Sequence, residues 1–154
     1  MVRKLYSRAS KHTRGGGLLM TNPKKYQPTQ QQTREFVTKW QELLNLQHWD
    51  ITVGFKKLDE ANAEVIFAPK GVRCEISFDL TKKEINSDHH LEMIVVHEMV
   101  HIISRHQVRS IKRLYDYSYG TNGDIGASLM FEFACHEEDL CDHLTKVLME
   151  LHND

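Results

Sequence analysis

The sequence predicts a single α+β domain with an N-terminal helix, a small, mostly antiparallel three-stranded sheet and two further helices. Its 154 residues suffice for one domain with a real core. Hydrophobic residues make up 40 % of the chain, as in ordinary globular proteins. Along the chain, the apolar periodicity changes from that of a helix to that of strands and then back to that of a helix.

Residues 1–25 are expected to form a basic, mobile tail that precedes a single domain at residues 26–154. The tail contains seven Lys or Arg and no acidic residue, whereas the remaining 129 residues hold 13 Lys or Arg and 21 Asp or Glu. Its longest apolar run, "LLM", is too short for a signal peptide. A solvated tail is favoured over an arm that binds nucleic acid.

The segment "PTQQQTREFVTKWQELLNLQHW" predicts the first helix. Thr29 can cap its N-terminus, with Gln32 as the second member of a capping box. The apolar residues of this segment recur at helical spacing, which predicts one buried face. The members of this face are Phe36, Val37, Trp40, Leu43 and Leu44.

Three short segments then show strand character, namely residues 50–55, 63–68 and 72–79. In the third of these, Val72, Cys74, Ile76 and Phe78 alternate with polar residues, which predicts one buried face. Because the segments are close together in the sequence, antiparallel pairing is expected between them.

A helical pattern returns at Ser87 or Asp88, either of which can cap a helix that runs through His106. Residues 113–126 are polar and rich in Tyr and Gly, which predicts a loop. A last helix is expected at residues 127–151. Its apolar stripe consists of Met130, Phe133, Leu140, Leu144, Leu148 and Leu151.

The stretch "IVVHEMVHII" at residues 94–103 places two histidines and a glutamate in an apolar helix. His97 and His101 are four residues apart and share one face, so their imidazoles can bind one metal ion. Glu98 is turned by about 100° from His97, near a metal but not bound to it, where it can accept a proton. Burying such groups without partners costs about 1–3 kcal/mol each, and a bound cation removes that cost.

The alternative is that these histidines are ordinary core residues that happen to be four apart. With ten histidines in the chain, a chance pair at this spacing is common. The glutamate between the histidines, the continuous apolar surroundings and the three upstream strands favour the metal site.

The motif "HEMVH" resembles the HExxH signature of zinc metallopeptidases. The order of helix, strands, motif helix and final helix over residues 28–150 resembles the minimal zincin fold of small gluzincin-like, phage-type metallopeptidases. The resemblance implies a zinc-dependent peptidase with one zinc ion per chain. It assigns metal binding to His97 and His101 and the role of general base to Glu98.

The HExxH motif itself does not identify the third zinc ligand. The extended metzincin motif is disfavoured, because Ser104 and Gln107 stand where it requires Gly and His. Gluzincins take the ligand from a glutamate on a later helix, and three glutamates are candidates: Glu132, Glu137 and Glu138. Glu138 is preferred, since Asp142 follows four residues later as in gluzincins and can orient a liganding histidine. Glu137 is the second choice.

A rival metal set lies in "CHEEDLCDH", but its spacing matches no recognised zinc finger. Its members are Cys135, His136, Cys141 and His143. By resemblance, the strand before the motif helix, "GVRCEISFD", is expected to hold substrate as an added strand. One of Tyr115, Tyr117 and Tyr119 could donate a hydrogen bond to the developing oxyanion.

The expected partner is a peptide or protein substrate, with no membrane partner. Three cysteines without a CxxC pair indicate a reducing, cytoplasmic setting, which is that of a bacterial host if the chain is phage-encoded. One alternative function is a zinc-binding protein of zincin fold with a structural or interaction role and no useful proteolysis. A role on nucleic acid, suggested by the basic tail, is disfavoured by the acidic body.

Overall fold

The computed structural model describes residues 26–119 and 124–153, so the predicted tail at residues 1–25 lies outside the described residues. Three helices accompany one three-stranded sheet, which confirms the α+β class. The helices are α1 (Gln30–Leu43), α2 (Asp88–Tyr119) and α3 (Asp124–Asn153). The strands are β1 (Asp50–Phe55), β2 (Ala63–Phe67) and β3 (Arg73–Phe78). No described helix combines the length and the hydropathy that a membrane span requires.

The cap of α1 is confirmed in part. The Thr29 hydroxyl accepts a hydrogen bond from the Gln32 backbone N–H at 3.1 Å, as an N-cap does. The Gln32 side chain does not return to Thr29 but donates to Asp88 Oδ1 at 2.6 Å, at the start of α2. Val37 and Trp40 are buried as predicted, whereas Leu43 is exposed. The hydrogen bond from Gln32 to Asp88 thus joins the N-terminal ends of α1 and α2.

The sheet has the order β1-β3-β2 and is mixed. β2 and β3 are antiparallel as expected, and Pro69 and Gly71 lie in the turn that joins them, with Gly71 at φ +82°. The expectation fails for β1, which pairs in parallel with β3 (Asp50 opposite Arg73). Closeness in sequence predicts antiparallel pairing only when consecutive strands lie side by side, and here β3 inserts between the consecutive strands β1 and β2.

Asp79, directly after β3, holds the connection between β1 and β2. Its carboxylate accepts hydrogen bonds from the Leu58 N–H at 3.0 Å and from the Thr81 hydroxyl at 2.6 Å. The hydrogen bond from the Thr81 side chain, followed by that from the Leu58 backbone, lowers the pKa of Asp79 to about 2. The side chain is buried, so the crossover depends on an ionised acid inside the fold.

This arrangement predicts an acid-sensitive fold. Because the folded pKa of Asp79 is depressed, its contribution to stability is present above the unfolded pKa near 4 and is lost as the pH falls toward 2. Asp79→Asn should lower the urea midpoint at pH 7 and flatten its decline between pH 5 and pH 2. Asp59→Asn, at an exposed position of the same connection, is the control. An unchanged pH profile in Asp79→Asn would contradict this role.

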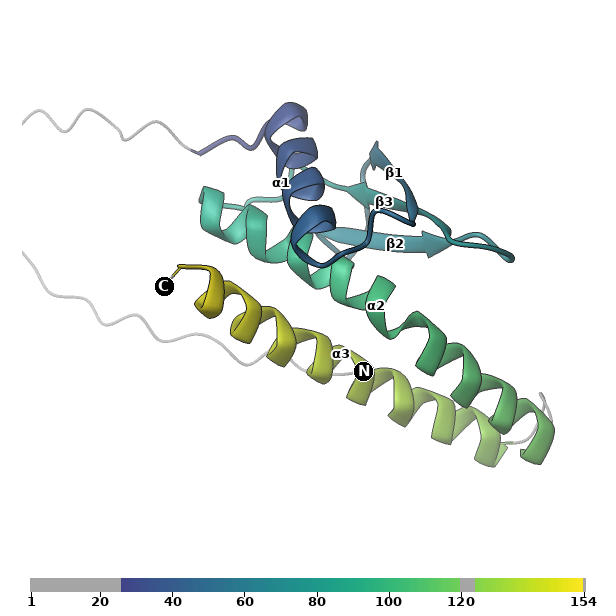
Figure 1. Cartoon of the computed structure of the whole chain (residues 1–154). Helices are drawn as coiled ribbons and strands as arrows, with labels where there is room; N and C mark the ends of the chain where they lie inside the picture. The colour runs from purple at the N-terminus through teal and green to yellow at the C-terminus, as the bar shows by residue number, and fades with distance from the viewer. Residues whose placement is uncertain (1–25, 120–123, 154) are drawn as a thin grey trace, which may run out of the picture.

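The hydrophobic core lies between the sheet, α1 and α2 (Figure 1). Ile76 and Phe78 of β3 are fully buried, as are Val95, Val96 and Met99 of α2. α1 is tied to α2 by Glu92, which accepts hydrogen bonds from Trp40 Nε1 at 2.8 Å and Lys39 Nζ at 2.7 Å. The core therefore fixes the rotation of α2 about its axis, and with it the direction in which the motif histidines face.

The two long helices differ from the prediction in two ways. Ser87 caps α2, accepting from the His90 N–H at 3.1 Å, but the helix continues to Tyr119 through residues predicted as a loop. With 32 residues, α2 is about 48 Å long, and α3 runs beside it past the sheet (Figure 1). The predicted stripe of α3 is also wrong at Leu140, Leu144 and Leu151, which are exposed, whereas Leu148 packs against the core.

Candidate metal centre

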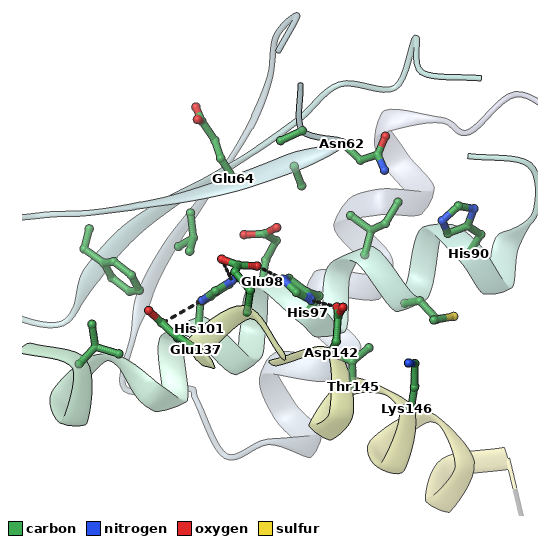
Figure 2. Close-up of a pocket in the computed structure, with 18 residues that line it drawn as sticks. Asn62, Glu64, His90, His97, Glu98, His101, Glu137, Asp142, Thr145 and Lys146 are labelled. Atoms are coloured by element: carbon green, nitrogen blue, oxygen red, sulfur yellow. Dashed lines mark hydrogen bonds and ion pairs between the residues drawn. The ribbon is translucent and has the colours of Figure 1, made fainter. Parts of the chain in front are cut away.

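His97 and His101 lie on the side of α2 that faces α3, with their Nε2 atoms 3.1 Å apart. Their side chains are 20 % and 13 % exposed. The opposite side of this helix is anchored in the core, as the preceding section describes. The packing of α2 therefore fixes the direction of the two histidines, and both rings point into the same part of the pocket (Figure 2).

Glu138 of α3 completes a group of three. Its Oε2 lies 3.3 Å from His97 Nε2, and its Oε1 lies 3.5 Å from His101 Nε2. One potential ligand atom from each residue lies within 4.8 Å of the others, so this group could hold a metal ion. The structure thus brings the preferred candidate Glu138 to the two histidines, across the contact between α2 and α3.

The far nitrogen of each ring also faces a carboxylate (Figure 2). His97 Nδ1 lies 3.1 Å from Asp142 Oδ1, and His101 Nδ1 lies 3.1 Å from Glu137 Oε1. An ionised carboxylate only accepts hydrogen bonds, so a carboxylate beside Nδ1 favours the tautomer that keeps the proton on that nitrogen. Nε2 of each ring faces Glu138. A metal ion bound at Nε2 would require this tautomer.

Glu98 lies beside this group and is deeply buried, with 6 % of its surface exposed. Burial raises the pKa of Glu98 to about 7, while the neighbouring His101 opposes the shift. The residue lines the same pocket as the histidines but belongs to neither group of potential metal ligands. It is thus a carboxyl group close to the centre that remains available for proton transfer.

The pocket is a cleft of about 810 Å³, lined by residues of β2, α2 and α3 (Figure 2). β2 contributes Ala63, Glu64, Val65 and Phe67 to its wall. The expectation that residues 71–79 hold a substrate strand is wrong, because β3 is central and both of its edges are paired. β2 is the edge strand on the cleft, and the sequence pattern alone did not show which strand would be central.

A second group of potential ligands shares His101. It consists of His101, Glu137 and Cys141, with Cys141 Sγ 3.5 Å from His101 Nδ1. Burial, followed by the nearby Glu137, raises the pKa of Cys141 to about 12. A thiol binds metal as its thiolate, so this group is the weaker of the two.

The other candidates are not assembled. Glu132 is exposed and does not line the cleft. The rival set fails because Cys135, His136 and His143 are exposed on α3 while Cys141 is buried, and they form no group among the described residues. The side chains of Tyr115, Tyr117 and Tyr119 lie outside the described part of the structure.

Two features were missed from the sequence. One is the role of Glu137 as partner of His101 Nδ1, where it also accepts from Ser104 Oγ at 3.3 Å. The other is Thr145, whose buried hydroxyl lines the cleft and has no hydrogen-bond partner among the described residues. The spacing of Glu137, Cys141 and Thr145 at every fourth position was the available signal, since it marks the inward side of α3.

No family model, curated protein or solved structure matches this chain.

Proposed function

We propose that this protein is a zinc-dependent peptidase whose zinc ligands are His97, His101 and Glu138. The observation that carries the proposal is the spacing of the potential ligand atoms. The two histidine Nε2 atoms lie 3.1 Å apart, and the Glu138 carboxylate lies 3.3 Å from His97 Nε2 through Oε2 and 3.5 Å from His101 Nε2 through Oε1. A tetrahedral zinc ion with bonds of 2.0–2.1 Å has ligand–ligand edges of about 3.3–3.4 Å. The spacings between the two rings and the carboxylate are close to these edges, which supports one zinc ion shared by the three residues.

The donor set supports a catalytic rather than a structural zinc site. Catalytic sites commonly have three protein ligands from His, Asp or Glu and keep a fourth position open. Here the three residues line a cleft wide enough for a substrate. When bound, zinc would supply Lewis-acid chemistry and lower the pKa of a water molecule toward neutrality.

Glu98 is the proposed general base. It is fixed by burial, lines the cleft and lies one residue from His97, and a nearby cation would favour its ionised form. In that form it can take a proton from the attacking water and pass it to the departing amine. The lone pairs of its carboxylate are not used by any described hydrogen bond, which leaves them free for this transfer.

The free edge of β2 supports a peptide as substrate. Among the described residues, β2 pairs only with β3, so its other edge has unpaired backbone groups beside the cleft. An extended peptide can add to such an edge through main-chain hydrogen bonds, which demand little of its sequence. This mode would place the peptide carbonyls in the cleft that Glu98 and the three proposed ligands line.

The test is turnover of a casein or mixed peptide library by purified protein. Activity should disappear with a chelator and return when zinc is added. A protein that binds zinc at these residues but cleaves no peptide would instead have the structural or interaction role. A protein that cleaves peptides equally well after complete metal removal would contradict the proposal.

The two outer carboxylates should tune zinc affinity. Asp142→Asn and Glu137→Gln should each weaken zinc binding by about 10–100-fold, because the ring that each carboxylate orients loses its fixed tautomer. Asp139→Asn, on an exposed position of the same helix, is the matched control and should bind zinc normally. Competition with a chromophoric chelator measures all three, and equal affinities throughout would refute the orienting role.

A further inference from the structure

The C-terminal half of α3 carries more apolar surface than the core covers. Its inward side holds Cys141, Thr145 and Met149, all buried. Four more apolar side chains stay exposed: Leu140 (49 %), Leu144 (37 %), Val147 (36 %) and Leu151 (71 %). We propose that these four residues, the leucine seam, form the interface of a symmetric dimer of this chain in which two α3 helices pack antiparallel.

The spacing of the seam is that of a coiled coil. Its members follow one another at intervals of four, three and four residues, which is the a/d pattern of a heptad repeat. At 100° per residue they fall within an arc of about 60°, turned by about 130° from the buried side. α3 packs mainly against α2, so this arc is not needed to hold the helix in place.

The seam lies away from the cleft. Glu138, Asp142 and Lys146 line the cleft, and on a helical projection the centre of these three lies about 170° from the centre of the seam. A second molecule bound to the seam therefore leaves the cleft open. Association through this face is compatible with any ligand at the metal centre and does not depend on the proposed activity.

A second copy fits this face because the seam is self-complementary. With a two-fold axis between Leu144 and Val147, Leu140 lies against Leu151 of the second copy, and Leu144 lies against its Val147. The same register places His143 beside Glu150 of the second copy, and symmetry makes this pair twice. Both residues are exposed within one chain. Apolar and polar groups thus match in one isologous arrangement.

The test is the mass of the full chain in solution, measured by sedimentation or light scattering over a concentration series. Wild type should rise from 18.0 kDa to twice that mass. Leu144→Lys should stay monomeric at every concentration. Because Leu144 is not part of the core, this variant should melt where wild type melts when wild type is dilute enough to be monomeric. Phe131→Lys is the control: Phe131 is 67 % exposed on the opposite side of α3, so this variant should dimerise like wild type.

A charge exchange tests the register. His143→Glu should weaken the dimer by about five-fold, because it faces Glu150 of the other copy. Adding Glu150→Lys should restore the association. A wild-type chain that stays monomeric, or a Leu144→Lys variant that dimerises as wild type does, overturns the interface. An exchange that fails to restore the dimer overturns the antiparallel pairing.

Discussion

Glu98→Gln is expected to lower kcat for peptide hydrolysis by about 1000-fold while the zinc content stays at one ion per chain. Glutamine keeps the size of the side chain, which matters at a position that is only 6 % exposed. Its amide cannot accept the proton of the attacking water, so the chemical step is lost. Zinc binding is retained, because Glu98 is not one of the three proposed ligands. Single-turnover kinetics and elemental analysis on the same sample measure both quantities.

The control for this variant is Glu64→Gln. Glu64 also lines the cleft, but its side chain is 40 % exposed and pairs with Lys56 at 2.6 Å. It should keep kcat near the wild-type value. If Glu98→Gln retains more than about one-tenth of wild-type kcat, proton transfer by Glu98 is refuted, since a general base contributes at least about 100-fold.

His101→Ala and His97→Ala should each reduce zinc affinity by more than about 100-fold and abolish turnover. Loss of an outer carboxylate alone costs up to about that much, and a direct ligand contributes more. Of the two substitutions, His101→Ala should also lower the free energy of unfolding more than His97→Ala. The His101 side chain is 13 % exposed and contacts Glu137 at 3.1 Å, so its removal leaves the largely buried Glu137 carboxylate with the Ser104 hydroxyl but without the imidazole.

His90→Ala is the matched control for the histidine variants. His90 belongs to the same helix and lines the same cleft, but it is in neither group of potential ligands. Its loss should leave zinc binding unchanged. Isothermal titration with zinc at fixed pH distinguishes the three variants. Equal zinc affinity in His90→Ala and His101→Ala would show that the motif histidines do not hold the metal.

Local signals were sufficient for most helices and strands of the fold. Thr29 and Ser87 mark helix starts through their hydroxyls, and β1 occupies the residues predicted for it. The order of the strands was not predictable in this way. It depends on Asp79, which binds the backbone of Leu58 and lets the connection between β1 and β2 pass the end of β3. The apolar periodicity of a strand does not show which other strand it pairs with, so the insertion of β3 between β1 and β2 could not be predicted from it.

The candidate metal centre was likewise predictable only in part. His97 and His101 were predictable because four-residue spacing on one helix fixes their relation. Glu138 comes from another helix, and its approach depends on how α3 rotates against α2. Leu140, Leu144 and Leu151 were wrongly predicted to be buried, because an exposed apolar seam and a buried helix side have the same sequence pattern. The inward side is instead marked by Cys141 and Thr145, which are smaller and less apolar.

The most direct measurement is a crystal structure of the zinc-loaded protein, with the metal located by anomalous scattering. The account predicts one zinc ion 2.0–2.1 Å from Nε2 of His97 and of His101, and about 2.0–2.2 Å from a carboxylate oxygen of Glu138. Glu98 should lie beside the ion without binding it. Zinc held instead by His101 Nδ1, Glu137 and Cys141, or by none of these residues, would contradict the central claim.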